Sequence, residues 1–266
     1  MLLIDNHVHA GDKYGPVENV LKEMDANGVT HAVIVQHMGQ YNNNYLRDCL
    51  ERYPDRLWAV CMVDPTLPDA AKTLKTLLKK EKFHGVRLSA STLAKRHDLW
   101  YMAAECYGVI SVTGLQPRDA GQVYRLKEFL DDNPNAKLKI EHLGHPDPTM
   151  PPPYPTYQRV MELAEYKNVY LQVSSPYTHS KQEYPYEDMD AFVAIAKKHF
   201  GPWRLLWGSC YPPVQNHMTY AQSLAWLDTL CFDEKQKTAI LQNNPVRLWD
   251  PKKRKIGDVD LTESSK

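Results

Sequence analysis

The sequence predicts a single-domain α/β protein, a (β/α)8 barrel of the TIM type. Three observations predict this fold: a length of 266 residues, eight short strand-like runs, and helical patterns between them. A barrel of eight β/α units typically takes about 250 residues. A doubly wound sheet is the alternative, but it does not need eight strands, and no G-x-G-x-x-G motif follows any of them.

The predicted strands are short runs rich in apolar and β-branched residues. Several are nearly continuous apolar stretches, such as AVIVQ, WAVCMV and VISVTG, as expected where both faces of a parallel strand are buried. In chain order the eight predicted strands span residues 2–9, 30–36, 57–63, 85–89, 108–114, 138–142, 169–174 and 204–208.

The stretches between the strands carry apolar residues three and four positions apart, which is the period of an amphipathic helix. The clearest helices are predicted at residues 17–26, 70–80 and 120–130, with another at 233–242 after the eighth unit. Long proline-containing loops at 146–155 and 175–185 each follow a strand, where the loops of a barrel build the active-site face. The barrel is expected to occupy residues 1–249, and residues 250–266 form a polar C-terminal tail.

Composition excludes several classes of protein. The 32 Lys and Arg residues balance 32 Asp and Glu residues, so the basic excess of a nucleic-acid-binding protein is missing. A mean hydropathy of −0.53 and the lack of a long charge-free apolar run argue against a membrane role. The chain reaches Asp5 too early for the apolar core of a signal peptide. We therefore expect a small-molecule substrate as the partner and leave a homo-oligomer open.

Cysteine usage points to the cytoplasm. The five cysteines are widely scattered and form no C-x-x-C pair, which predicts reduced thiols and not a disulfide framework. Four of them fall within helix or strand patterns and are predicted to be core residues, namely Cys49, Cys61, Cys106 and Cys231. The fifth, Cys210, follows the eighth predicted strand.

Reactive side chains gather at the predicted carboxyl ends of the strands. His7 and His9 end the first strand, and residues two apart in a strand point to the same side. His142 ends the sixth strand, and Cys210 follows a Gly-Ser bend after the eighth. In a barrel these strand ends meet at the catalytic mouth. Imidazoles there can bind a divalent metal ion, or hold and protonate an anionic substrate.

Four segments in this order resemble the amidohydrolase superfamily: IDNHVH at 4–9, EHLG at 141–144, LLWGSCYP at 205–212 and NPVRL at 244–248. The chain is most similar to the amidohydrolase-2 (amidohydrolase-related) branch, in its 2-pyrone-4,6-dicarboxylate lactonase-like and sugar-lactonase subgroup. The resemblance implies a TIM barrel that hydrolyses a carbonyl of a small cyclic or carboxylated substrate, namely a lactone, ester or amide. A metal-dependent decarboxylase or hydrolase of the same branch is the alternative.

Two departures from the superfamily pattern bear on mechanism. Metal-dependent relatives carry a further His or a carboxylated Lys around strands four and five, whereas this chain has VRLS at 86–89 and VTGLQ at 112–116. The resemblance to the lactonase-like subgroup therefore implies that no metal is tightly bound. Should zinc or manganese bind after all, the expected ligands are His7, His9, His142 and Cys210.

The second departure is Cys210, which stands where the superfamily has a near-universal aspartate. Three interpretations follow for this thiol. It acts as a nucleophile or base activated by a neighbouring histidine, it is a thiolate ligand of zinc, or it marks a lost base in a protein that binds without efficient turnover. The residues expected to be catalytic are thus Cys210, His7, His9 and His142.

Substrate-binding residues are expected at the same rim. Arg87 ends the fourth strand, and a guanidinium group pairs bidentately with carboxylate or carbonyl oxygens. Tyrosine hydroxyls and further polar groups follow other strands, which suits a flat, polar, cyclic substrate. The full predicted set is Arg87, Gln116, Arg118, His145, Tyr154, Tyr177 and Tyr211.

Overall fold

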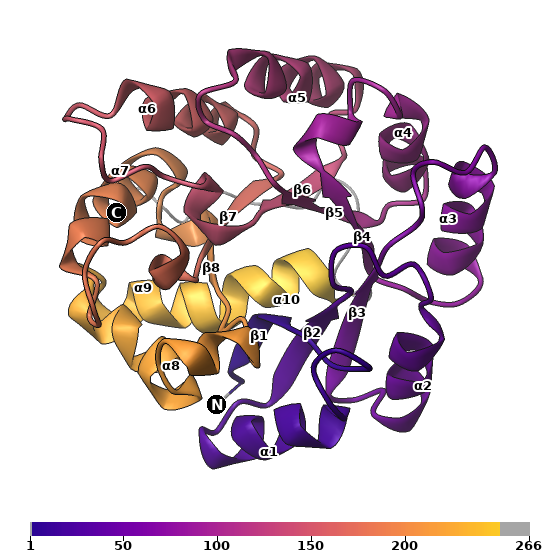
Figure 1. The fold of residues 1–266 in the computed structure, drawn as a ribbon, viewed down its shortest axis with the longest axis horizontal. Helices are drawn as coiled ribbons and strands as arrows, with labels where there is room; N and C mark the ends of the chain where they lie inside the picture. Colours follow the sequence, from indigo (N-terminus) through magenta and orange to yellow (C-terminus); the bar gives the residue numbers. More distant parts are fainter. Residues whose placement is uncertain (1, 251–266) are drawn as a thin grey trace.

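The computed structural model describes residues 2–250 and confirms the predicted barrel. Eight parallel strands form one sheet in chain order, and helices surround it (Figure 1). The strands agree with the predicted ranges to within about two residues at most ends. They are β1 (Ile4–Val8), β2 (His31–Val35), β3 (Leu57–Cys61), β4 (Gly85–Ser89), β5 (Val109–Thr113), β6 (Lys137–Ile140), β7 (Val169–Val173) and β8 (Leu205–Trp207).

The sheet closes between β8 and β1 just beyond the end of β8. There Cys210 N donates to His7 O at 2.8 Å, and His9 N donates to Tyr211 O at 2.8 Å. Val8 and Tyr211 form a parallel bridge at the same place. Gly208 permits this approach, because a Cβ atom there would lie only 3.0 Å from the Cβ of His7. Closure therefore brings the two predicted reactive segments side by side.

The helices form the outer layer, and the three clearest sequence predictions agree with α1, α3 and α5. Their residues bury one apolar face against the strands, as the period predicted. The helices that follow the eight strands are α1 (Val17–Ala26), α2 (Asn44–Arg52), α3 (Ala70–Lys79), α4 (His97–Glu105), α5 (Ala120–Asp132), α6 (Pro155–Met161), α7 (Asp190–Phe200) and α8 (Tyr220–Thr229).

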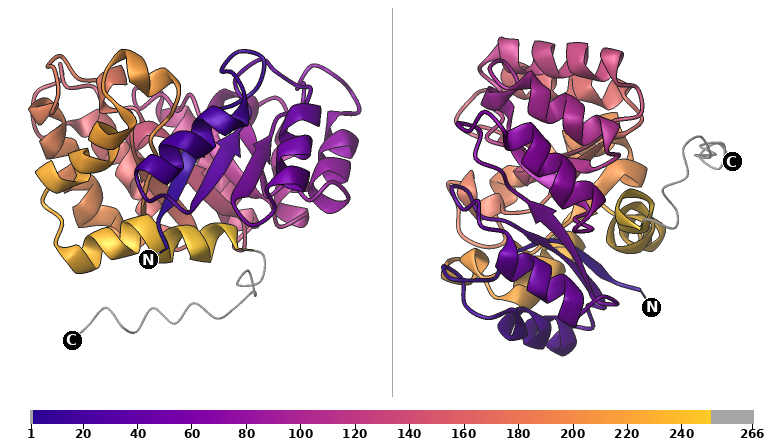
Figure 2. Two further views of the ribbon diagram at one scale, coloured as in Figure 1. Left: turned by 90° about the horizontal axis from the view of Figure 1, so that it is seen from below. Right: turned by 90° about the vertical axis from the view of Figure 1, so that its right-hand side faces the viewer.

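The helix predicted at 233–242 is longer than expected. It begins with α9 (Glu234–Thr238), passes through a π-helical turn at Ala239–Asn243 and ends as α10 (Asn244–Trp249). This yellow segment lies across the end of the barrel where the strands begin (Figure 2). Trp249 is fully buried there, and its Nε1 donates to Asn6 Oδ1 at 2.8 Å. The NPVRL segment thus closes the bottom of the barrel.

The barrel interior has an apolar lower half and a polar upper half. An inner apolar cluster packs around the plug formed by Leu248 and Trp249; its strand residues are Val33, Val35, Val60, Val109, Tyr170 and Leu206. Ser111 on β5 and Gln172 on β7 come two residues after members of this cluster and also point inward. Lys139 on β6 pairs with Ser111 in the strand register, and all three residues are fully buried. The polar layer lies next to the mouth and forms the floor of the candidate site.

Three further sequence expectations concern the rest of the chain. Cys49, Cys61 and Cys106 are buried as predicted, but Cys231 is exposed, because it lies in the turn after α8 and not within the helix. Within residues 2–250, no helix has the length and apolar character needed to cross a membrane. The predicted tail at 250–266 lies outside the described residues apart from Asp250.

Candidate active site

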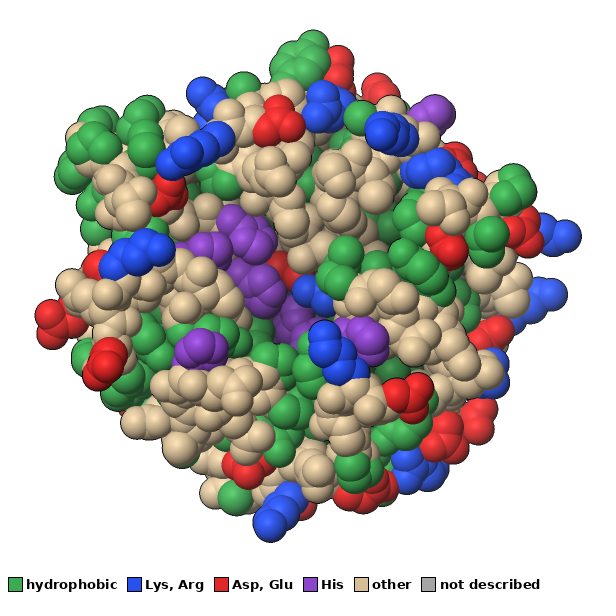
Figure 3. Space-filling model, viewed as in Figure 1, with side chains coloured by type: hydrophobic (Ala, Val, Ile, Leu, Met, Phe, Trp, Pro, Cys, Tyr) green, Lys and Arg blue, Asp and Glu red, His purple; other side chains and the backbone are tan. Residues whose placement is uncertain are grey.

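The structure brings the four predicted catalytic residues together at the mouth of the barrel. Histidine side chains gather in and around the central hollow of this face (Figure 3). A cavity of about 300 Å³ opens there, and His9, His142 and Cys210 all line it. His7 lies beneath them and is fully buried. The remaining lining residues are Lys13, Tyr14, His37, Met38, Arg87, Ser175, Tyr177, Thr178 and Pro213.

His7 and His9 form a hydrogen-bonded pair whose protons can be assigned from their partners. His9 Nδ1 lies 2.6 Å from the carbonyl oxygen of Val35, which only accepts, so Nδ1 carries the hydrogen and Nε2 has a lone pair. His7 Nε2 lies 3.1 Å from that lone pair and is therefore the donor. Burial lowers the pKa of His7 well below its ordinary value and lowers the pKa of His9 to about 3. Both rings are neutral at neutral pH.

Lys139 lies beneath His7 in the barrel interior. Its Nζ donates to Asn6 O at 3.1 Å, lies 3.5 Å from His7 Nδ1 and sits 5.6 Å from the ring centre of Trp249. Burial lowers the pKa of Lys139 to about 8, against the raising effect of Glu141. Lys139 is therefore predominantly an ammonium ion at pH 7.

Arg87 and Glu141 form a buried ion pair across the mouth. Arg87 Nε lies 3.1 and 3.2 Å from the two carboxylate oxygens, and Nη2 lies 2.7 Å from Oε2. Ser111 Oγ donates to Oε1 at 2.6 Å. Burial alone would raise the pKa of Glu141, but the charge of Arg87, together with that of Lys139, holds it well below its ordinary value. Glu141 is thus a carboxylate that is fully buried and paired.

His142 begins an unusual backbone turn. His142, Leu143, Gly144 and His145 all have positive φ angles, of 48°, 55°, 69° and 59°. L-residues rarely adopt this left-handed conformation even singly, and strained runs of this kind cluster at functional sites. Gly144 has a second reason to be glycine, because a Cβ atom there would lie 2.8 Å from Val160 Cγ1. The turn directs the His142 ring into the mouth.

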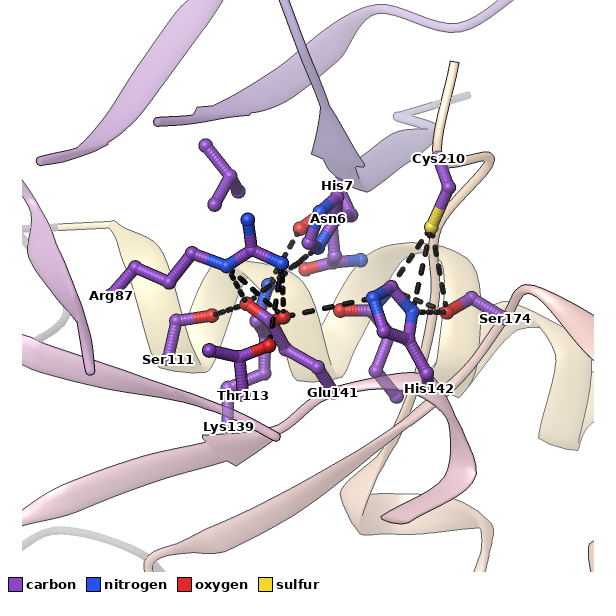
Figure 4. A network of polar contacts seen from close by, with 12 residues as sticks. Asn6, His7, Arg87, Ser111, Thr113, Lys139, Glu141, His142, Ser174 and Cys210 are labelled. Atoms are coloured by element: carbon purple, nitrogen blue, oxygen red, sulfur yellow. Dashed lines mark hydrogen bonds and ion pairs between the residues drawn. The ribbon is translucent and has the colours of Figure 1, made fainter. Parts of the chain in front are cut away.

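His142 lies between Glu141 and Cys210 (Figure 4). His142 Nε2 is 3.6 Å from Glu141 Oε2, while Nδ1 is 3.7 Å from Cys210 Sγ and 3.2 Å from Ser174 Oγ. Burial lowers the pKa of His142 well below its ordinary value, so the ring is neutral. A hydrogen on Nε2 faces the carboxylate, and this leaves the Nδ1 lone pair toward the thiol. The three side chains form a carboxylate–imidazole–thiol row.

Cys210 holds its thiol in a polar setting although it is almost fully buried. Its backbone is also left-handed, with φ of 58°. Ser175 Oγ donates to the sulfur at 2.8 Å, and Gln172 Nε2 donates at 3.8 Å. Burial raises the pKa of the thiol to about 12, although Ser175 and Ser174 act to lower it. The resting group is therefore a neutral thiol with donors poised to stabilise developing negative charge on sulfur.

The predicted substrate-binding residues fall into three places. Arg87 and Tyr177 line the cavity with Cys210. Gln116, Arg118 and His145 instead line a second cavity of about 440 Å³, together with His179, and the His145 ring centre lies 5.8 Å from that of His142. Two tyrosines line neither cavity. Tyr154 packs on Phe192 with ring centres 4.5 Å apart, and Tyr211 packs on Tyr220 at 5.8 Å.

A sequence model of the family described as Amidohydrolase matches residues 9–250. The chain belongs to the amidohydrolase family. It is therefore an enzyme of the hydrolase type. Among curated proteins, the chain is similar to L-fucono-1,5-lactonase from Burkholderia ambifaria. The two are 25% identical over 225 residues, which cover 77% of this chain and 73% of that protein.

Solved structures of other amidohydrolases share the fold. A probable 2-pyrone-4,6-dicarboxylic acid hydrolase from Acinetobacter baumannii, with citric acid bound, is 24% identical and superposes with a TM-score of 0.76 over 93% of this chain and 99% of that one. An amidohydrolase from Burkholderia multivorans with bound zinc is 18% identical, with a TM-score of 0.75 and the same coverage. At these identities the likeness establishes the fold alone.

The residues of this amidohydrolase do not fit a resident metal ion in the arrangement seen. Their spacing suits one, since ligating atoms of His7, His142 and Cys210 lie within 4.8 Å of one another. However, His7 Nε2 donates a hydrogen to His9 in this arrangement and presents no lone pair. Arg87 and Lys139 bring two positive charges to the same interior, and Glu141 is the one carboxylate in contact with them among the described residues. The further positive charge of a metal ion is unfavourable next to these two cations.

Sequence reasoning missed four functional neighbours, namely Lys139, Glu141, Gln172 and Ser175. A signal for the first two was present. Residues 137, 139 and 141 are all charged, and they alternate with the apolar residues Leu138 and Ile140. The three charged side chains therefore point to the same face of a strand in a parallel sheet, whose strands are buried on both faces. Charged residues at inward positions of a buried strand indicate an interior polar network. Ser175 had no such signal, because its place depends on the course of the loop after β7.

Proposed function

We propose that this amidohydrolase hydrolyses the ring ester of a small lactone, with Cys210 as the nucleophile and His142 as its base. One observation carries this proposal: the row Glu141–His142–Cys210 at the mouth, with the thiol and the imidazole lining one cavity. A nucleophile within reach of a base, and a base oriented by a third group, is the arrangement used for covalent acyl transfer. Of the three histidines considered from the sequence, His142 is the one in contact with the thiol.

The lining of the cavity favours a neutral, hydroxyl-rich ring as substrate. The charge of Arg87 is matched by Glu141, and Lys13 is exposed at the rim. The other polar groups of the cavity are hydroxyls and imidazoles, which exchange hydrogen bonds with sugar hydroxyls. The similarity to an L-fucono-1,5-lactonase points to the same class, a sugar-acid lactone.

In the first step the thiol attacks the lactone carbonyl. The Sγ–H proton of Cys210 passes to the Nδ1 lone pair of His142, and sulfur forms a bond to the carbonyl carbon. The ring C–O bond then breaks, and the proton on His142 moves to the departing alkoxide oxygen. The product of this step is a thioester on Cys210 that carries the opened hydroxy acid. Glu141 stabilises the imidazolium form of His142 between the two transfers.

In the second step water releases the acid. His142, again neutral, takes a proton from water, and the oxygen attacks the thioester carbonyl. The C–S bond breaks, and the proton returns to the sulfur as the thiol is restored. Ser175 and Gln172 donate to the sulfur and stabilise the thiolate character that it gains in both steps. Arg87 and Tyr177 line the cavity and are placed to orient the carbonyl and hydroxyl groups of the substrate.

The test is a panel of 1,4- and 1,5-sugar lactones, with 2-pyrone-4,6-dicarboxylate as a dianionic comparison. Hydrolysis is followed by proton release in weakly buffered solution. We expect turnover of neutral lactones by the metal-free protein and a loss of at least about 10³-fold in Cys210→Ala and His142→Gln. Cys231→Ala, at an exposed cysteine that does not line the cavity, serves as the matched control and retains activity.

Three outcomes would contradict this proposal. A gain of lactone hydrolysis in Cys210→Asp would show that the cysteine marks a disabled base. Activity that depends on stoichiometric zinc or manganese would support the metal-dependent alternative. Release of carbon dioxide from a carboxylated substrate, without ring opening, would indicate a decarboxylase.

A further inference from the structure

We propose that Lys139 is a positioning residue that holds His7 in the Nε2–H tautomer and thereby keeps zinc out of the histidine site. The inference rests on the metal-free part of the proposed function, and it assigns to Lys139 a role that the carboxylate–imidazole–thiol row does not require. Lys139 is fully buried on β6, in the polar layer under the mouth. It acts through His7 and does not line the cavity with Cys210.

The hydrogen bonds form a directed chain from the ammonium group. Lys139 has three N–H bonds, and three partners surround it: Asn6 O at 3.1 Å, His7 Nδ1 at 3.5 Å and the face of Trp249 at 5.6 Å. An ammonium group only donates, so His7 Nδ1 must accept and the ring hydrogen is on Nε2. That hydrogen points to the His9 Nε2 lone pair at 3.1 Å. The chain ends where His9 Nδ1 donates to Val35 O.

The other tautomer of His7 would create a metal site. With hydrogen on Nδ1, His7 would face Glu141 Oε1, which lies 3.9 Å away, and would present a lone pair at Nε2. Two lone pairs, on His7 Nε2 and His9 Nε2, would then oppose each other across 3.1 Å. Such a pair is stable when a cation lies between the two nitrogens, and a carboxylate behind a histidine is the usual support of a zinc ligand. Lys139 stands where it disfavours this state.

The first measurement is the tautomer of His7 in the full-length protein. Two-bond ¹H–¹⁵N spectra of ¹⁵N-histidine-labelled protein separate Nδ1–H from Nε2–H rings, and His7→Gln assigns the signal. We expect Nε2–H in the wild type with and without added zinc chloride, and a change from Nε2–H to Nδ1–H in Lys139→Met when zinc binds. A wild-type spectrum with hydrogen on Nδ1 of His7 would overturn the inference, whether or not the variant folds.

The second measurement is zinc affinity by calorimetry at neutral pH, with zinc chloride and no substrate. We expect Lys139→Met to bind one zinc ion at least about tenfold more tightly than the wild type, the scale on which partners of a ligand change metal affinity. Lys139→Arg retains a cationic donor and is expected to match the wild type. Lys137→Met, two residues earlier on the same strand, is the matched control.

Equal zinc affinity of wild type and Lys139→Met, with both folded, would contradict the inference. Neither measurement uses the substrate or the thiol reaction. The tautomer and the zinc affinity can therefore be measured even if the protein hydrolyses no lactone. A wrong tautomer prediction would, in turn, not contradict the proposed reaction of Cys210, which the lactone assay tests separately.

Discussion

Mild acid should destabilise this protein steeply, because three histidines at the mouth are buried in their neutral form. Burial lowers the pKa of His9 to about 3, and it lowers the pKa of His7 and His142 well below the ordinary value. A histidine whose folded-state pKa is lowered contributes its full stability above the unfolded pKa of about 6.5. That contribution is lost as the pH falls, since the unfolded chain binds protons that the folded protein cannot.

The expected size follows from proton linkage. Between pH 7.5 and 5.5, one such histidine lowers the free energy of unfolding by about 1.4 kcal/mol, because its unfolded form becomes protonated and its folded form does not. The three histidines together give about 4 kcal/mol, a large part of the roughly 5–15 kcal/mol that stabilises a domain. His145 and His179, whose pKa values burial also lowers, act in the same direction. Burial raises the pKa of Asp5, so this one carboxyl group acts in the opposite direction and increases the free energy of unfolding as the pH falls.

The assay is urea unfolding followed by fluorescence at pH 7.5, 6.5 and 5.5. His9→Gln removes one neutral imidazole, so we expect the difference between pH 7.5 and 5.5 to shrink by about 1.4 kcal/mol. His199→Gln, on the exposed side of α7, is the control, since an exposed imidazole contacts water in both states. A wild-type free energy of unfolding that is equal at pH 7.5 and 5.5 would refute the reasoning.

Three further predictions test other parts of the site. Glu141→Gln leaves Arg87 without its carboxylate in a buried position, so urea unfolding at pH 7 should show a loss of about 3–5 kcal/mol, whereas Asp48→Asn in an exposed pair with Arg52 should show a far smaller loss. Because burial raises the pKa of Cys210 to about 12, iodoacetamide at pH 7.5 should label exposed Cys231 well before Cys210, and faster labelling of Cys210 would contradict the neutral thiol. Gly144→Ala forces a side chain into a left-handed position against Val160, so thermal unfolding should show a loss of about 2–4 kcal/mol, and an unchanged midpoint would contradict the strained turn.

The barrel could be predicted from the sequence because each of its signals is local. Continuous apolar runs indicate strands that are buried on both faces, and the three- and four-residue periods indicate the helices over them. The rim positions of His7, His142 and Cys210 followed from the same reasoning, since parallel strands end at one edge. The helix at the bottom of the barrel was predicted too short, because a π-helical turn carries it on into the NPVRL segment.

The proton arrangement of the site could not be predicted, because it depends on contacts between distant segments. Arg87 and Glu141 are 54 residues apart, and the sequence around each one predicts only a charged residue near the end of a strand. The tautomer of His7 depends on its contacts with His9 and with Lys139, whose ammonium group reaches it from β6. The pairing of His142 with Cys210 depends on a left-handed turn that no local propensity favours. The alternation of side chains along a strand predicts the side to which each one points, but it does not predict which side chains come into contact.

The most direct test of the central claim is the acyl-enzyme itself. The protein is mixed with a sugar lactone that it hydrolyses, quenched in acid within milliseconds, and examined by intact and peptide mass spectrometry. We predict an added mass equal to that of the lactone on the peptide that contains Cys210, absent from Cys210→Ala and from His142→Gln. An active wild-type enzyme that carries no adduct on Cys210 at any quench time, while turning over the same lactone, would contradict covalent catalysis by this thiol.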